Sequence, residues 1–355
     1  MSISLKVIPV IKLYKDYVLV LDQRYLPTKV IFRKIKNVSE MADAIKKMVV
    51  RGAPLIGISA AFALCLAVRK ISKNKINDRL KEWKTAVNIL NSSRPTAVNL
   101  FTATSIMNKT FQEYVHASYK ELVDAVENKA RELFNEDLEM SKRIGKIGSS
   151  LVKDNTVWLT HCNAGGLATS GLGTALAVFY EAKKQGKNFT VFVDETRPLF
   201  QGSRLTAWEL CKAKIKSYVI SDSAACFAIK TKKITGIITG ADRIAANGDT
   251  ANKIGTFSLA VISNYFGIPF YVAVPSTTFD LSISSGDKIP IEERDEKEIR
   301  CLRGINIVTP EAKIWNPAFD ITPGNLISGF ITDRGLIKPP YVKRINDLFC
   351  KTVNN

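Results

Sequence analysis

Cys162 and Asp242 are the residues of this sequence best placed to do chemistry, because each lies within three residues of the end of a short apolar run. A cysteine at a strand end, near helix N-termini and basic groups, can have a lowered pKa and act as a thiolate. A carboxyl group in a closed pocket has a raised pKa and can donate a proton. Each residue alone also fits a structural role, as a buried thiol or a turn-capping aspartate. Asp194 or Glu195 could act as the acid in place of Asp242, so the residues alone do not decide which carboxyl group donates the proton.

A glycine-rich segment at 160–174 contains Cys162 and has glycines at 165, 166, 171 and 173. It follows an apolar run and precedes a predicted helix at 175–184. Glycine permits close backbone approach to a ligand, so the pattern indicates a ligand-binding loop. It is neither the GxGxxG of dinucleotide-binding folds nor a P-loop, and neither a dinucleotide nor ATP is indicated. His161 in this loop could orient another group, although a histidine at a strand end more often has a structural role, with its ring nitrogens hydrogen-bonded within the fold.

Three basic residues lie immediately before predicted helices. The N-terminus of a helix has free N–H groups and the positive end of the helix dipole, so it binds anions. A nearby guanidinium adds charge-assisted hydrogen bonds to a phosphate. For a single loop, an ordinary solvated cap explains the pattern equally well. Three such loops together favour a phosphorylated small molecule as the partner: Arg51 before 55–68, Arg94 before 96–107, and Lys253 in the segment 252–255 that opens a helix through 262.

The elements that would position these residues differ before and after residue 150. Beyond it, five short apolar runs end in polar or acidic residues, with helical stretches between them, at 156–160, 189–193, 217–220, 234–239 and 270–274. This alternation predicts a parallel α/β sheet, because parallel strands need helical crossovers. Ligands bind beyond the carboxyl ends of such strands. The side chains expected there are Cys162, Asp194, Asp222 and Asp242.

The first part of the chain reads differently. Residues 4–36 predict two or three short antiparallel strands. From Ser39, a plausible N-cap, the pattern turns helical, with Met41, Ala44, Ile45 and Met48 on one face. No glycine occurs between residues 57 and 145, which suits a run of helices. We therefore expect an N-terminal domain over 1–150, a small sheet plus a helix bundle, and a C-terminal α/β domain over 151–355.

Composition narrows the class of protein. Of 355 residues, Lys and Arg number 51 and Asp and Glu 33, giving a net charge of +18, which favours anionic partners. Six scattered cysteines without a CxxC pair, and no signal peptide, predict a cytoplasmic protein. The longest apolar run, 14 residues at 55–68, predicts a buried helix rather than a membrane span. Two histidines without clustered ligands predict no metal site, and no nucleic-acid-binding motif is present.

Several ordered sequence blocks resemble methylthioribose-1-phosphate isomerases. Their superfamily also contains ribose-1,5-bisphosphate isomerases and the regulatory subunits of initiation factor 2B. The similarity covers nearly the whole chain. Gly166 and Leu172 depart from it, standing where alanine and an aromatic residue are expected, which affects the shape of the pocket rather than the chemistry. The blocks lie at 51–57, 93–100, 160–165, 194–198, 201–207, 240–244, 247–249, 252–256 and 316–320.

The resemblance implies a fold, an activity and a set of residues. The fold is a β-plus-helical N-terminal domain followed by a Rossmann-like domain, usually in a homodimer. The activity is isomerisation of 5-methylthioribose 1-phosphate to 5-methylthioribulose 1-phosphate in methionine salvage, without a cofactor. Cys162 and Asp242 correspond to the catalytic residues. The substrate-binding positions correspond to Arg51, Gly52, Ala53, Arg94, Gln201, Asn252 and Lys253.

Two alternatives remain at this stage. Ribose 1,5-bisphosphate is a rival substrate, which needs a basic rather than an apolar pocket at its 5-position; the strand segment at 4–36 favours the methylthioribose enzyme. A non-catalytic regulatory subunit is the other alternative, and the presence of both Cys162 and Asp242 argues against it.

In the expected reaction Asp242 protonates the ring oxygen, and Cys162 then takes part in moving hydrogen from C2 to C1. Both proton transfer and a hydride shift remain open.

Overall fold

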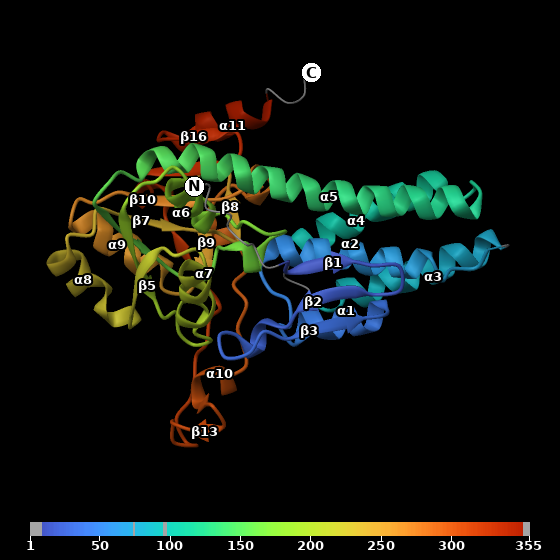
Figure 1. Cartoon of the computed structure of the whole chain (residues 1–355), viewed down its shortest axis with the longest axis horizontal. Coiled ribbons are helices and arrows are strands. Elements are labelled where there is room, and N and C mark those ends of the chain that lie inside the picture. The colour runs from blue at the N-terminus through green and yellow to red at the C-terminus, as the bar shows by residue number, and fades with distance from the viewer. Residues whose placement is uncertain (1–8, 74, 95–97, 351–355) are drawn as a thin grey trace. The chain divides into compact units, whose positions relative to one another are not determined.

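The computed structural model describes residues 9–73, 75–94 and 98–350. They form two compact units (Figure 1). The helical unit comprises residues 9–139 together with 165–173, and the sheet unit comprises 140–164 together with 174–350. The glycine-rich segment therefore packs with residues that come much earlier in the sequence.

The helical unit begins with a three-stranded antiparallel sheet, made of β1 (Ile11–Leu13), β2 (Val18–Leu21) and β3 (Phe32–Ile35). The central strand pairs with both neighbours, and its residues Val18 and Val20 are fully buried. The antiparallel strands predicted for this part of the chain are confirmed.

Helix α1 (Val38–Lys46) is capped by Asn37 and not, as the sequence suggested, by Ser39. The Glu40 N–H donates to Asn37 Oδ1 at 2.9 Å, and the Glu40 carboxylate accepts the Lys36 N–H at 2.7 Å. This exchange resembles a capping box, which satisfies backbone donors at both ends of the first turn. The predicted buried face is confirmed at 41, 44 and 45, whereas residue 48 is only half-buried.

Four longer helices complete this unit: α2 (Ala53–Val68), α3 (Ile76–Asn91), α4 (Val98–Tyr114) and α5 (Tyr119–Gly148), the last of which continues into the sheet unit. The apolar run 55–68 is a buried helix, as predicted. Helix α2 packs closely on α4, since a β-carbon at Gly57 would lie 2.8 Å from the Asn99 carbonyl oxygen. The predicted start of the helix 96–107 lies outside the described residues. Within the described part of the chain, no helix combines the length and apolarity needed to cross a membrane.

The sheet unit is built on a seven-stranded sheet among the described residues, in the order β16-β15-β10-β7-β4-β5-β6. All five predicted apolar runs are strands of this sheet, and all neighbouring strands are parallel except β16, which pairs antiparallel with β15. The predicted mixed α/β fold with a parallel sheet is confirmed. The strands are β4 (Thr156–Thr160), β5 (Phe189–Asp194), β6 (Lys216–Ile220), β7 (Gly236–Thr239), β10 (Phe270–Ala273), β15 (Gly329–Thr332) and β16 (Gly335–Ile337).

Hydrophobic cores cover both faces of the sheet. Successive residues of a strand point to opposite faces, and Trp158 and Leu159 of β4 accordingly belong to different buried clusters. The Trp158 cluster includes residues of α6, and the Leu159 cluster includes residues of α8, α9 and α11. Burial on both faces is typical of parallel sheets. The helices of this unit are α6 (Ala175–Lys184), α7 (Ala207–Lys212), α8 (Ala225–Lys232), α9 (Thr256–Tyr265) and α11 (Tyr341–Cys350).

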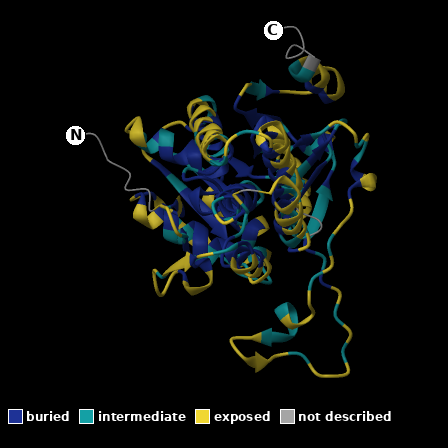
Figure 2. Cartoon of the chain, turned by 90° about the vertical axis from the view of Figure 1, so that its right-hand side faces the viewer, coloured by how far each residue is buried: buried dark blue, intermediate teal, exposed yellow. Residues whose placement is uncertain are grey.

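A smaller sheet and a projecting arm complete the unit. The sheet has the order β11-β8-β9-β14, from β11 (Phe279–Asp280), β8 (Arg243–Ala245), β9 (Thr250–Lys253) and β14 (Phe319–Thr322). The arm carries α10 (Lys297–Arg300) and the hairpin β12 (Cys301–Leu302) with β13 (Ile305–Asn306). Much of it is exposed (Figure 2). Asn252 and Lys253 end β9, so the prediction that they lie in a helix-opening loop is wrong.

Candidate active site

The carboxyl ends of four neighbouring strands carry the acidic and thiol groups predicted for the site. In the sheet these strands lie in the order β7-β4-β5-β6. Parallel strands present their carboxyl ends at one edge, where ligands bind in such folds. The side chains that follow or end these strands are Asp242 after β7, Cys162 after β4, Asp194 at the end of β5 and Asp222 after β6.

Cys162 is held in a left-handed backbone conformation by two hydroxyl groups. Its φ is +57°, which costs a residue other than glycine on the order of 1–3 kcal/mol. The Cys162 N–H donates to Thr196 Oγ1 at 2.8 Å. Thr206 Oγ1 donates to the Cys162 carbonyl at 2.5 Å. Side chains from other strands and turns therefore fix the backbone that carries this half-exposed thiol.

The segments that carry Cys162 and Asp242 touch each other. A β-carbon at Gly240 would lie 2.8 Å from the β-carbon of Ala164. These two residues lie two positions from Asp242 and Cys162, respectively. Asp242 is half-buried, and its N–H donates to the Ala251 carbonyl at 2.9 Å. The structure thus brings the two predicted catalytic segments together.

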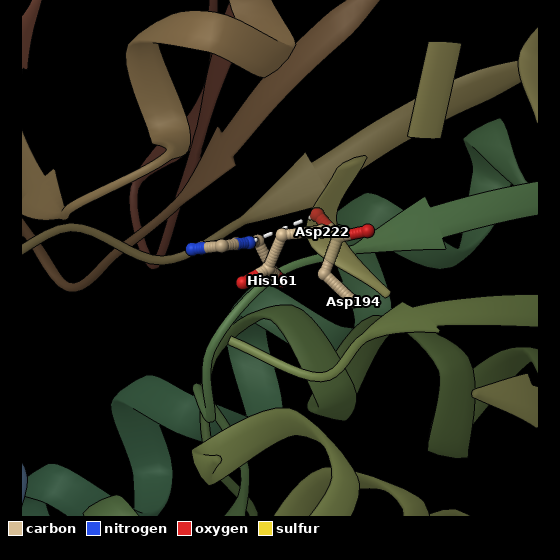
Figure 3. Close-up of side chains that lie close together, drawn as sticks. All are labelled: His161, Asp194 and Asp222. Atoms are coloured by element: carbon tan, nitrogen blue, oxygen red, sulfur yellow. Dashed lines mark hydrogen bonds and ion pairs between the residues drawn. The ribbon is translucent and has the colours of Figure 1, made fainter. Parts of the chain in front are cut away.

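His161 and Asp194 form a buried pair beside this segment, drawn together with Asp222 in Figure 3. The His161 Nδ1 and Asp194 Oδ2 atoms are 2.9 Å apart, and each side chain is 1% exposed. His161 Nε2 lies 2.9 Å from the Ile254 carbonyl, which can only accept, so Nε2 carries a proton. Burial raises the pKa of Asp194 to about 6, against the opposing effect of His161. Burial alone would lower the pKa of His161, but the hydrogen bond and charge of Asp194 leave it raised.

This pair should make stability depend on pH. Because its folded pKa is raised, His161 stabilises the fold fully below its usual pKa of about 6.5, and this contribution is lost as pH rises through the raised value. The free energy of unfolding of the wild type, relative to a His161→Asn/Asp194→Asn variant, should therefore fall from pH 6.5 to 8.5. The expected slope is at most about 1.4 kcal/mol per pH unit. Urea unfolding at several pH values measures it, and a flat or rising difference would contradict the assignment.

His161, Asp194 and Asp222 lie close enough to resemble a metal site, with one ligand atom of each within 4.8 Å of the others. Their donor atoms are largely used in other ways. Both ring nitrogens of His161 are engaged, and the Asp222 carboxylate accepts the N–H groups of Thr196 and Arg197, each at 2.7 Å. These contacts fit a hydrogen-bonded network better than a metal centre.

The remaining predicted binding residues of the sheet unit are mostly buried. Asn252 Nδ2 donates to Thr256 Oγ1 at 2.9 Å. Lys253 Nζ donates to the Ala318 carbonyl at 2.8 Å. Gln201 is 5% exposed, and its Oε1 has no hydrogen-bond partner among the described residues. A buried acceptor without a partner is costly, so this atom is well suited to a ligand hydroxyl.

One helix start predicted to bind an anion is already occupied by a carboxylate. Helix α9 has Gly255 as its N-cap, with φ of +104°. The Asp320 carboxylate accepts the N–H groups of Gly255 at 2.7 Å and Phe257 at 3.1 Å. The prediction of free donors for a phosphate is wrong at these two groups. Burial raises the pKa of Asp320, although its backbone hydrogen bonds oppose the shift.

The helical unit contains the other predicted binding residues, Arg51, Gly52, Ala53 and Arg94. Helix α2 begins at Ala53, and Gly52 is an N-cap without a side chain to satisfy the first N–H groups. Gly52 has φ of +91°, and a β-carbon there would lie 2.5 Å from that of Ala168. Both arginines are half-buried. As at the start of α9, the N-cap residue of α2 is a glycine that makes no side-chain cap.

Ala168 belongs to the glycine-rich loop, which two side chains of the helical unit hold. Gln23 Nε2 donates to the Leu167 carbonyl at 2.7 Å. The Ser170 N–H donates to Asp137 Oδ2 at 2.6 Å, and Asp137 is buried. Neither contact was predicted, because the partners are far apart in sequence and carry no motif.

A π-helical turn, Gly202–Thr206, carries Thr206, whose hydroxyl donates to the Cys162 carbonyl. A β-carbon at Gly202 would lie 1.7 Å from the Asp194 carbonyl oxygen, so one part of the backbone must move in Gly202→Ala. We expect this variant to lose about 2–3 kcal/mol of unfolding free energy. Ser203→Ala in the same turn is the matched control and should change it by less than about 0.5 kcal/mol. Urea denaturation measures both, and equal stability of the two variants would rule out this close approach.

Comparison with known proteins places the chain in a family. The sequence pattern of the Initiation factor 2 subunit family matches residues 49–339. The chain is 47% identical to methylthioribose-1-phosphate isomerase 2 of Pseudothermotoga lettingae, over 94% of this chain and 96% of that protein. The chain belongs to the Initiation factor 2 subunit family, among its methylthioribose-1-phosphate isomerases. It is therefore an isomerase. The protein of that name from Carboxydothermus hydrogenoformans is also 47% identical, over 95% and 98% of the two chains.

Solved structures agree with this placement. The crystal structure of 5-methylthioribose 1-phosphate isomerase from Pyrococcus horikoshii OT3 has a TM-score of 0.92 and 39% identity, covering 100% of this chain and 99% of that one. A structure described as the translation initiation factor eIF-2B delta subunit from A. fulgidus has a TM-score of 0.87 and 38% identity, covering 96% and 99%. The isomerase and the initiation-factor proteins share one fold.

Proposed function

We propose that the chain isomerises 5-methylthioribose 1-phosphate to 5-methylthioribulose 1-phosphate in methionine salvage. The observation that carries the proposal is the relatedness to isomerases of this name over almost the entire chain. The contact between the segments bearing Cys162 and Asp242 supports it, because the reaction needs two groups that act on neighbouring atoms of one small molecule.

The chemistry begins with ring opening, because phosphate on the anomeric oxygen leaves no free aldehyde. Asp242, in its protonated form, gives a proton to the ring oxygen as the bond between that oxygen and C1 breaks. The Cys162 thiolate then removes the proton from C2, which gives a phosphoenolate. The Cys162 thiol then delivers a proton to C1, and the C2 hydroxyl proton passes to the Asp242 carboxylate, which completes the ketose and restores both groups. A hydride shift from C2 to C1, with Cys162 assisting at the C2 hydroxyl, is the competing route.

Heavy water distinguishes the two routes of hydrogen transfer. If a proton is removed and returned, we expect deuterium at C1 of the product, detected by NMR. Deuterium at C1 excludes a pure hydride shift. Full retention of hydrogen at C1 favours the shift over a base that exchanges with solvent.

Substrate binding is assigned to Arg51, Gly52, Ala53, Arg94, Gln201, Asn252 and Lys253. The guanidinium groups suit a phosphate, and the uncapped start of α2 offers N–H groups to an anion. The partnerless Gln201 Oε1 suits a sugar hydroxyl. Asn252 and Lys253 already donate to neighbouring oxygen atoms, which fixes their positions.

Turnover assays with two sugar phosphates test the substrate. We expect conversion of 5-methylthioribose 1-phosphate with a kcat/KM at least about a hundredfold above that for ribose 1,5-bisphosphate, because an apolar pocket for the methylthio group would leave a second phosphate without basic partners. Preference for the bisphosphate would replace the proposed substrate. Turnover of neither substrate would favour the alternative function, that of a non-catalytic regulatory subunit.

We also propose a cytoplasmic homodimer. The described cysteines Cys65, Cys211, Cys226 and Cys301 are not in disulfides, which suits a reducing compartment. Helices α8 and α9 pack together and expose the large apolar side chains of Phe227 (70%) and Tyr265 (82%). Sedimentation should give a dimer for the wild type and a monomer for Phe227→Glu/Tyr265→Glu. A monomeric wild type, or an unchanged dimer in the variant, would remove this surface from consideration.

A further inference from the structure

The geometry points to Thr196 as a positioning residue that holds Cys162 through its backbone, with Asp222 holding Thr196 in turn. The inference rests on the proposed role of Cys162. It concerns three residues that follow three adjacent parallel strands, β4, β5 and β6. The contacts run across the strand ends, from Asp222 to Thr196 to Cys162.

The hydroxyl of Thr196 has a defined direction of hydrogen bonding. Its oxygen accepts the Cys162 N–H at 2.8 Å. Its proton is donated to the Asp194 carbonyl, 3.1 Å away. Thr196 is fully buried, so water does not replace either contact readily. A side chain without a hydroxyl at this position would remove the acceptor that the Cys162 N–H uses.

Asp222 fixes the backbone of Thr196 itself. Thr196 has φ of +64°, another left-handed residue that is not glycine. The two oxygens of Asp222 accept consecutive N–H groups, from Thr196 and Arg197, each at 2.7 Å. Two hydrogen bonds to a charged carboxylate are among the strongest that a backbone turn can receive. They stabilise the turn in which the Thr196 hydroxyl faces Cys162.

The consequence concerns the direction of the thiol. Fixing φ and ψ of Cys162 fixes its Cα–Cβ bond, and a displacement of about 1 Å in a reacting group can lower the rate a hundredfold. Loss of the Thr196 hydroxyl should therefore lower kcat while leaving substrate binding almost intact, because Thr196 has no assigned contact with the substrate.

The test compares Thr196→Val, which has nearly the same shape but no hydroxyl, with Thr196→Ser, which keeps the hydroxyl. We expect Val to lower kcat at least about tenfold with KM within about threefold, and Ser to restore kcat to within about threefold of the wild type. Asp222→Asn, which presents an N–H group to one of the two backbone donors, should have an effect in the same direction. Asp222→Asn therefore tests the inference even if the valine variant fails to fold. Melting temperatures establish that the compared variants are folded.

Hydrogen–deuterium exchange supplies a readout that does not depend on turnover. The Cys162 amide, followed by fragment-resolved mass spectrometry, should exchange at least about tenfold faster in Thr196→Val and at the wild-type rate in Thr196→Ser. Unchanged exchange overturns the inference. Faster exchange with an unchanged kcat also overturns it, since the hold on Cys162 would then not affect the reaction. If the wild type turns over neither sugar phosphate, the proposed function fails, and exchange alone still decides whether Thr196 holds Cys162.

Discussion

Cys162→Ser should lower kcat for 5-methylthioribose 1-phosphate by about a thousandfold and change KM by less than about threefold. Positioned acid–base groups contribute 10²–10⁴-fold to a rate. A serine hydroxyl at neutral pH has almost no anionic form, so it cannot replace a thiolate as the base. The variant should fold normally, because the hydrogen bonds from Thr196 and Thr206 are made to the backbone of this residue, which serine retains.

Initial-rate kinetics measure this effect, and Cys211→Ser is the matched control. Cys211 is an exposed free cysteine on α7, and its replacement should leave kcat within about twofold. Near-normal turnover by Cys162→Ser would exclude the thiol from the mechanism. An equal loss in both variants would point to a general effect of cysteine replacement.

Asp242→Asn should lower kcat to a similar extent, on the order of 10²–10⁴-fold. An asparagine amide cannot deliver a proton to the ring oxygen, although its size and its ability to accept hydrogen bonds are retained. Since ring opening precedes every later step, substrate should still bind but remain closed. Binding measured by calorimetry should therefore change by less than about threefold while turnover is lost.

Asp347→Asn provides the matched control, since this exposed aspartate of α11 undergoes the same change in charge. Its kcat should equal that of the wild type. If Asp242→Asn kept near-normal turnover, the acid would have to be another carboxyl group. The buried Asp194, with its pKa of about 6, would be the next group to test.

The sequence predicted the strands of the large sheet well, because each is a short apolar run that ends in polar residues. Burial on both faces demands such runs, and the turn residues after them mark the carboxyl ends. The positions of Cys162 and Asp242 beyond the carboxyl ends of two strands could be predicted for the same reason. The order of the strands could not be predicted, since it depends on pairings between residues such as Tyr271 and Gly329 that are distant in the chain.

The supporting residues of the site were harder to find. Thr196, Thr206 and Asp320 act through backbone groups of other segments. Threonine and aspartate are common in loops for many reasons, so their types carry no signal without the fold. The start of α9 shows the same limit: its glycine was visible in the sequence, but the carboxylate that occupies its N–H groups lies 65 residues further along.

Because residues 165–173 pack with the helical unit, they and the first 139 residues should come from the same parent when related genes are recombined. The chain passes from one unit to the other after residue 139, returns for the glycine-rich loop, and crosses again before residue 174. A single crossover between related genes near residue 150 would join Gln23 and Asp137 of one parent to the loop of the other. Chimeras should therefore fold best when 165–173 is inherited with the first 139 residues, as a two-part cassette.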